Sequence, residues 1–378
     1  MPVPTASSPT SSVPVLSAEA LARDLAVRDL TDPSTGPHAI QLLVDTAVET
    51  LAAEWQCAAR LHRSRPIVPI EDNYDRLGYH ADAITRDVRY TRYASETCVL
   101  RTHTSALIPP ALRHLAVHPE RDVVLACPGI VYRRDAIDRL HTGTPHQLDL
   151  WRVADRPMDD GHLERMIAVV LGALLPGLEY RVEPRVHPYT TNGRQVDVLA
   201  GGEWVEVLEC GLAASAVLAG AGLDAGRCAG LAMGMGLDRV LMVRKGIPDI
   251  RLLRSGDPRV AQQMLDLEPY RPVSSQPPVQ RDMSVAVDVD TTGEDLGDLV
   301  REALGEEADS VEAIEILSET PARDLPETAA RRLGISHGQK NVLVRVVLRN
   351  LDRTLTRVEA NVLRDRIFTT IHEGHPST

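Results

Sequence analysis

Apolar residues recur along the chain with two different periods, and each period predicts a different kind of element. From residue 40 to 55 the spacings of three and four are those of an amphipathic helix, and 163–175 is a second helix candidate. Short apolar runs at 123–126 and 205–208 are bounded by turn signals, as in the strands of a sheet. This part of the chain is therefore expected to combine helices with a mostly antiparallel sheet.

The C-terminal part has a pattern of its own. Three strand candidates and one helix candidate occur there, at 284–289, 311–316, 342–348 and 296–304. A helix closes the sequence with a capping box, because the Thr356 hydroxyl can accept from the Glu359 N–H while the Glu359 carboxylate accepts from the Thr356 N–H. These elements predict a small α+β unit.

Breaks in composition predict the domain boundaries. Residues 1–13 are mostly Pro, Ser, Thr and Val, without the charged start and apolar run of a signal peptide, and we expect a disordered tail. The stretch 248–281 is rich in Pro and Ser, which indicates a linker. We therefore expect one domain at 14–262, a linker at 263–281 and a second domain at 282–378.

Composition limits the class of protein. A chain of 378 residues with 43% hydrophobic content has room for about two folded domains. No stretch approaches the length of apolar sequence that spans a membrane, so no membrane partner is expected. The five cysteines are scattered without a Cys-x-x-Cys pair, which argues against a zinc site or disulfide framework and fits a reducing cytoplasm. They are Cys57, Cys98, Cys127, Cys210 and Cys228.

Charge leaves nucleic-acid binding open. The formal net charge of −12 argues against indiscriminate binding, but a local basic face can still hold a folded RNA. Between 340 and 367, seven basic residues stand against three acidic ones. A solvated charged face and an RNA-contacting face both explain this segment.

The first chemical motif is the polar cluster that follows the apolar run near residue 125. If two antiparallel strands meet there, Arg133 and Asp135 lie on one face. The guanidinium could then clamp an α-phosphate, and the carboxylate could accept from an adenine amino group. A surface ion-pair cluster is the alternative for so short a motif.

The second motif is a pair of glycines before an arginine. The third glycine of a dinucleotide fingerprint is absent, so a Rossmann interpretation fails. Gly234 and Gly236 could instead let a strand pass under a nucleotide before a helix whose first turn projects Arg239 at a triphosphate. A plain strand-to-helix turn with a solvated arginine is the alternative.

Together these segments resemble the phenylalanyl-tRNA synthetase family, because several of its motifs occur in the same order. The residues 102–105, Thr-His-Thr-Ser, are similar to its substrate loop. Residues 133–147 resemble motif 2 with the following strand, and 234–251 resemble motif 3. The segment from Tyr270 to Glu359 is similar to the family's anticodon-binding domain. The resemblance implies an α+β fold, with a class II antiparallel-sheet catalytic core and a C-terminal ferredoxin-like domain.

The resemblance also implies roles for individual residues. Arg133 and Arg239 would be the catalytic phosphate clamps that hold ATP, and Asp135 would contact adenine. Glu206 would be a Mg²⁺ ligand, for which an exposed strand acid is the alternative. The residues expected to hold the amino acid are His103, Ser105, Gln147, Asp149, His187, Tyr189 and Ala232. For His103 and His146 a hydrogen-bonded structural histidine is the alternative, and for His146 it is favoured.

Several positions differ from the family pattern, and the resemblance implies that they cluster around one bound ligand. Two phenylalanines of the family's side-chain pocket align with His187 and Tyr189, and a more polar pocket disfavours a bare phenyl ring. The aromatic that stacks on adenine is Pro145, and the glycine before Cys210 is Glu209. The family's glutamine, arginine and glutamate near the substrate are replaced by Ile108, Pro110 and Asp149.

The N-terminal and C-terminal regions also differ from those of some family members. The coiled coil of the bacterial α subunit is missing, as in single-chain members. The sequence stops at Thr378, where the family continues into a last strand, so a shortened domain with an exposed sheet edge is expected.

Three functions remain open on the sequence. The first is charging of tRNA with phenylalanine, with the tRNA held through the C-terminal domain. The second is adenylation of another amino acid for a carrier protein or biosynthetic partner, and the third is a non-catalytic tRNA-binding regulator. Retention of Arg133 and Arg239 disfavours the third. Monomer and homodimer are both open, and the helix at 40–55 is a candidate dimer seam.

Overall fold

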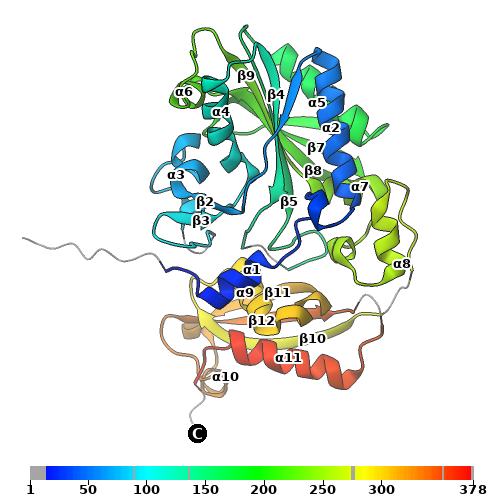
Figure 1. The fold of residues 1–378 in the computed structure, drawn as a ribbon. Coiled ribbons are helices and arrows are strands. Elements are labelled where there is room, and N and C mark those ends of the chain that lie inside the picture. Colours follow the sequence, from blue (N-terminus) through cyan, green and yellow to red (C-terminus); the bar gives the residue numbers. More distant parts are fainter. Residues whose placement is uncertain (1–13, 88–89, 135–136, 274–276, 351–352, 376–378) are drawn as a thin grey trace, which may run out of the picture.

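The computed structural model describes residues 14–87, 90–134, 137–273, 277–350 and 353–375. The tail expected at 1–13 lies outside these residues. The described chain forms a large unit built on a seven-stranded sheet and a smaller C-terminal unit built on a three-stranded sheet (Figure 1).

The large sheet is antiparallel except at one edge. In spatial order it consists of β1 (Ala58–Leu61), β4 (Asp122–Ile130), β5 (His146–Ala154), β9 (Ala229–Gly236), β8 (Glu203–Ala213), β7 (Thr190–Ala200) and β6 (Tyr180–Pro184). Only β1 runs parallel to its neighbour, β4. The strands expected at 123–126 and 205–208 are thus confirmed within β4 and β8, as is the antiparallel character of the sheet.

Two long helices cover one face of this sheet, α2 (Ala39–Trp55) and α5 (Asp160–Leu174) (Figure 1). Both helices expected from the apolar spacing are confirmed. The apolar stripe of α2 packs into the same core as the inward residues of α5 and of the strands, including Leu148 and Leu150 of β5. The stripe is therefore accounted for by the chain's own core.

Shorter elements cover the opposite face. They are α4 (Ile108–Val117), α6 (Ser215–Gly220), α3 (Ile70–Asn73) and the hairpin of β2 (Ile67–Pro69) with β3 (Cys98–Leu100). The first two pack with Trp151 of β5 and Ala232 of β9 in a second core. Ile108, one of the positions that depart from the family, is fully buried in this core.

The C-terminal unit has the succession strand, helix, strand, strand, helix. Its elements are β10 (Val279–Asp288), α9 (Gly293–Leu304), β11 (Val311–Pro321), β12 (Gln339–Leu348) and α11 (Arg357–Ile371), with a short α10 (Glu327–Leu333) before β12. The strand order is β10-β12-β11, with both pairs antiparallel. The predicted capping box of the closing helix is confirmed, since Thr356 and Glu359 exchange both hydrogen bonds.

Short helices occupy the segments that lead to and away from the core. They are α1 (Ala18–Leu25), α7 (Leu237–Lys245), α8 (Pro258–Ala261) and the 3₁₀ turns, of which Ile250–Arg254 and Gln262–Leu265 flank α8. The buried Lys245 ammonium lies 2.7 Å from the Asp266 carboxylate and so attaches the segment after α8 to the core.

The two units meet at the loop that follows β4. The Ile314 N–H of β11 donates to the Ile137 carbonyl at 2.9 Å, and Ile137 packs into the C-terminal core. Asp298 of α9 lies 3.3 Å from Arg134 and 3.2 Å from Arg92. A cavity of about 530 Å³ lies at this junction, with Arg92, Arg134 and Asp298 in its lining.

Two further expectations concern cysteines and membranes. All five cysteines lie in the described residues and are free. Within the described chain, no helix is long and apolar enough to cross a membrane.

Replacing a core residue of α2 tests the packing of this helix. Leu43 is fully buried and Leu42, its neighbour, is 40% exposed. Leu43→Ala is expected to lower the free energy of unfolding by about 2–5 kcal/mol, because it leaves a cavity. Leu42→Ala should change it by only about 0.5 kcal/mol. Urea unfolding followed by circular dichroism measures both, and equal losses would contradict this placement of the helix.

Candidate functional site

The candidate site lies on the sheet face opposite α2 and α5. Asp149 of β5 pairs with Gly234 of β9, and Gly234 pairs with Glu209 of β8. Cross-strand partners project to the same face, so these positions form one row across three strands. The next row on this face consists of Trp151, Ala232 and Gly211.

Asp149 is buried and receives hydrogen bonds from two hydroxyls. Thr104 Oγ1 donates at 2.7 Å and Ser105 Oγ at 2.9 Å, each to a different carboxylate oxygen. Burial raises the pKa of Asp149 to about 6, although these hydroxyls and Arg133 oppose the rise. The side-chain amide oxygen of Gln147 accepts a hydrogen bond from the backbone N–H of Thr104 at 3.2 Å. The strand and the loop before α4 are thereby joined at this point.

His103 lies in the same loop and has polar atoms without partners. Within the described chain, neither of its buried ring nitrogens has a hydrogen-bond partner. Burial, with a smaller contribution from Arg133, lowers the pKa of His103 to about 3, so the ring is neutral. The Asn73 backbone is a polar neighbour of the ring and raises its pKa slightly against the effect of burial. A neutral imidazole can donate from one nitrogen and accept at the other.

The loop is held in place by Asn73. Its side-chain amide donates to Thr102 Oγ1 at 2.9 Å and accepts from the Thr102 N–H at 3.2 Å. Both hydrogen bonds are buried, so they fix the backbone next to His103.

His187 and Tyr189 lie between β6 and β7 and contact the same face. The rings stack at 5.5 Å, and the Tyr189 ring lies 6.2 Å from that of Trp151. His187 Nε2 is 2.9 Å from the Glu209 carboxylate, and Arg185 Nε is 3.1 Å from it. Burial disfavours ionisation of Glu209, but His187, Arg185 and Arg133 outweigh burial and lower its pKa.

Arg133 lies just beyond β4. Its N–H donates to the Gly143 carbonyl at 2.9 Å, which continues the pairing of β4 with β5 past the regular strands. The guanidinium Nε donates to the Thr102 carbonyl at 3.0 Å. Asp135 lies outside the described residues, so the expected shared face with Arg133 stays a prediction.

Arg239 projects from the first turn of α7, directly after β9, as the glycine motif predicts. Nη1 donates to the Glu206 carbonyl at 3.2 Å, and Nη2 lies 3.3 Å from His141 Nε2. Because His141 Nδ1 lies 2.7 Å from Asp138, Nδ1 donates there and Nε2 accepts from Arg239.

Glu206 is aimed at the site by an irregularity of β8. Leu208 pairs with Val196 and Glu206 with Asp197, so Val207 is an extra residue on β8. Burial and the nearby Glu209 raise the pKa of Glu206, while Arg239 lowers it. Glu206 is thus half-buried beside other charges and is not a freely exposed strand acid.

The two arginines share one feature. Within the described residues, neither Arg133 nor Arg239 lies in an ion pair with a carboxylate. Their charges are met by carbonyl oxygens and one imidazole. A partly buried guanidinium in this state can still bind an anion such as phosphate.

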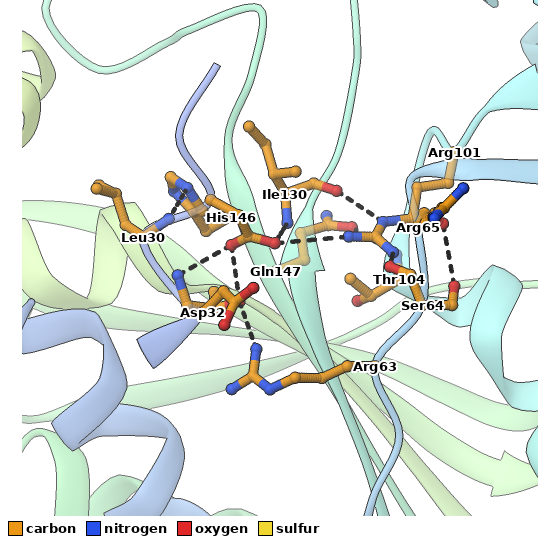
Figure 2. A network of polar contacts seen from close by, with 12 residues as sticks. Leu30, Asp32, Arg63, Ser64, Arg65, Arg101, Thr104, Ile130, His146 and Gln147 are labelled. Carbon is orange, nitrogen blue, oxygen red and sulfur yellow. Dashed lines mark hydrogen bonds and ion pairs between the residues drawn. The ribbon is translucent and has the colours of Figure 1, made fainter. Parts of the chain in front are cut away.

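His146 is a structural residue, as favoured from the sequence. It is fully buried, and its Nε2 accepts from the Leu30 N–H at 3.1 Å (Figure 2). Nδ1 therefore donates to Asp238, at 2.9 Å. Figure 2 also shows Arg101 beside the Ile130 carbonyl, to which it donates at 2.7 Å. These bonds attach the N-terminal segment and the loop before α4 to the ends of β4 and β5.

The basic segment near the C-terminus is mostly neutralised. Six of its seven basic residues form ion pairs with carboxylates: Lys340, Arg345, Arg349, Arg353, Arg364 and Arg366. This arrangement favours the ion-paired charged face over a surface of unpaired cations for RNA.

Two contributors to the site were not predicted from the sequence. Thr104 belongs to the Thr-His-Thr-Ser motif but was not expected to contact the ligand, yet it gives the shorter of the two hydroxyl hydrogen bonds to Asp149. Tyr79 stacks on His103 at 5.7 Å and lies 6.3 Å from Tyr189. The place of Thr104 in the motif could have predicted its role in the site. Nothing in the sequence around Tyr79 distinguishes it from the other tyrosines.

Comparison with known proteins agrees with this geometry. The family model of the class II core domain of tRNA synthetases (F) matches residues 49–264. A phenylalanine–tRNA ligase alpha subunit of Prochlorococcus marinus (strain MIT 9313) is 38% identical over 191 residues, which are 50% of this chain and 56% of that protein. A chloroplastic/mitochondrial phenylalanine–tRNA ligase of Arabidopsis thaliana is 28% identical over 316 residues, or 80% of this chain and 68% of that protein.

The chain spans just over half the length of the alpha subunits that it matches, with 59% coverage of the one from Leptospira biflexa. The core-domain match, however, takes in more than half of this chain. On that match, and with the antiparallel sheet whose strands β4 and β9 lead to Arg133 and Arg239, the chain belongs to the phenylalanyl-tRNA synthetase family of class II tRNA synthetases.

Proposed function

We propose that the chain activates an amino acid with ATP and transfers it to tRNA. In the first step the amino-acid carboxylate attacks the α-phosphorus of ATP. An acyl–phosphate bond forms, the bond to the β-phosphate breaks and pyrophosphate leaves. The observation that carries the proposal is the pair of arginines, Arg133 and Arg239, that have no carboxylate partner among the described residues.

The arginines act by charge and position. Negative charge grows on the phosphate oxygens during the attack, and preorganised guanidinium groups stabilise it without reorganising. Arg133 would hold the α-phosphate and Arg239 the triphosphate, each oriented by a bond to a backbone carbonyl. Asp135 is proposed to contact the adenine.

The amino acid is proposed to bind over the row of Asp149 and Gly234. An ionised Asp149 would pair with the α-ammonium group, and Ser105, Gln147 and His103 would complete its surroundings. His187, Tyr189 and Ala232 would border the side chain, since they lie on the same face. Catalysis on this scheme consists of positioning and charge neutralisation.

Mg²⁺ is proposed as the metal cofactor. Among the described residues, no three His, Cys, Asp or Glu side chains gather to hold a metal by themselves. The donor set nevertheless fits Mg²⁺, which takes one or two carboxylates together with substrate phosphates and water. Glu206 would supply the carboxylate, and the ion would neutralise phosphate charge.

The domain division proposed from the sequence assigns activation to 14–262 and tRNA binding to 282–378, with a linker at 263–281. We expect the C-terminal unit to be ferredoxin-like. Its ion-paired basic segment makes this role a weaker proposal than activation. A cytoplasmic location and the choice between monomer and homodimer stay predictions.

A second function is favoured by one observation. His187 and Glu209 lie where a phenylalanine pocket is expected to be apolar, and their atoms are in contact. Adenylation of a different amino acid, for tRNA or for a carrier protein, is therefore the alternative. A non-catalytic regulator is disfavoured, because it has no use for Arg133 and Arg239 as two phosphate clamps.

Removal of one clamp tests the mechanism. Arg239→Ala is expected to lower amino-acid-dependent ATP–pyrophosphate exchange by at least about a hundredfold, as loss of a charge-stabilising donor does. Arg244→Ala is the matched control, because Arg244 lies on the same helix α7 and lines a separate surface. Exchange that persists in Arg239→Ala at the level of the control would disprove the proposed role.

The raised pKa of Asp149 predicts a pH dependence. Because that pKa is about 6, the acid is largely neutral below this pH and largely ionised above it. Only the carboxylate attracts an α-ammonium, so the KM for the amino acid should fall as the pH rises from about 5 to 7. Asp149→Asn should raise KM and flatten this profile. A flat wild-type profile over the same range would refute the assignment.

A further inference from the structure

The two acids of the central row are separated by a stretch of sheet without large side chains. Neighbouring strands are about 4.8 Å apart, so the α-carbons of Asp149 and Glu209 lie about 10 Å apart with Gly234 between them. A β-carbon on Gly234 would lie 3.8 Å from the Asp149 carboxylate. In the adjacent row Thr190 covers Gly211, and Ala232 is buried in the second core. The space for a flat ligand group is therefore over Gly234.

Glu209 is an ionised acceptor with unused capacity. Against the effect of burial, His187, Arg185 and Arg133 lower the pKa of Glu209. An ionised carboxylate has about four acceptor positions. Arg185 takes one oxygen from an exposed position. His187 Nε2 lies 2.9 Å from the other oxygen, so each oxygen has one neighbouring donor and keeps about one further acceptor position. A donor from a ligand would find a charged acceptor at this end of the row.

Aromatic rings surround the same area. The whole chain has one Phe, three Trp and eight Tyr. Tyr79, Tyr189 and Trp151 nevertheless gather here, and the Tyr189 ring centroid lies 6.3 Å from that of Tyr79 and 6.2 Å from that of Trp151. Such rings favour a planar ligand group, which they can contact by offset stacking.

Trp151 and His103 bring buried ring nitrogens to this cluster. Within the described residues these nitrogens make no hydrogen bond of good geometry, and their polar neighbours are the Asp149 carboxylate and the Asn73 backbone. A ligand made only of hydrocarbon would bury Glu209 without adding a hydrogen bond to it, which costs binding free energy.

We propose that the site selects an aromatic amino acid whose ring carries a hydrogen-bond donor, a hydroxyl or an amino group, and that Glu209 accepts this hydrogen bond. The inference rests on the amino-acid activation proposed above. The α-ammonium lies at Asp149 and the ring lies over Gly234. The span from the α-nitrogen to a para substituent is about 6–7 Å, which fits between two carboxylates that reach inward from strands about 10 Å apart.

Pyrophosphate exchange with the purified full chain tests the selection. The amino acids are phenylalanine, tyrosine, 4-aminophenylalanine and lysine. The wild-type protein is expected to prefer a ring-donor amino acid over phenylalanine by at least about tenfold in kcat/KM, since an unpaired acceptor rejects the analogue. Glu209→Gln, which keeps the shape and loses the charge, should reduce this ratio by about tenfold.

Glu203→Gln is the matched control, because Glu203 is an exposed acid on the same strand β8 and should leave the ratio unchanged. Preference for phenylalanine or lysine, or an unchanged ratio in Glu209→Gln, overturns the inference while the exchange itself upholds the proposed activation.

Absence of exchange with every amino acid would instead refute the activation. Isothermal titration calorimetry of the wild-type protein then decides the inference. Tighter binding of tyrosine or 4-aminophenylalanine than of phenylalanine supports it, and equal or absent binding overturns it.

Discussion

The arrangement of the molecule depends on the alternation of side chains along β5. Leu148 and Leu150 pack into the core with the helices α2 and α5, while Trp151 packs into the core on the other side. By alternation, His146 projects to the first side and Asp149 to the second. A slip of one residue would exchange the two sets and place a carboxylate in the hydrocarbon core. The buried pair of His146 and Asp238 opposes such a slip, because it attaches the start of β5 to α7. The same bond thereby sets the position of Arg239 relative to the strand that bears Asp149.

Charged groups of the candidate site are held by uncharged partners and can therefore still bind a charged ligand. Elsewhere in the described chain, arginines commonly pair with carboxylates, as Arg152 does with Asp122 at 2.7 Å. Arg133 and Arg239 bond carbonyl oxygens, which orient a guanidinium without cancelling its charge. Asp149 is held by hydroxyls, which have the same effect on an acid. Ligands with both an anionic and a cationic end match this arrangement.

The loop after β4 belongs to both structural units. Arg133 at its start contacts the substrate-loop residue Thr102, and Ile137 a few residues later pairs with Ile314 of the C-terminal unit. Asp298 of α9 adds two ion pairs to arginines of the large unit. Arg133 and a residue that docks the C-terminal unit are therefore only four positions apart in the chain.

The sequence by itself determined the elements and the motifs, because both are local. The spacing of apolar residues located α2 and α5, the pair Thr356 and Glu359 located a helix start, and ordered motifs identified the family. Only the tertiary structure decided the row that joins Asp149 to Glu209, because strand register is a sum of pairings between distant segments. It also decided that, among the described residues, Arg133 and Arg239 bond carbonyl oxygens of distant segments, since these contacts depend on the folded chain.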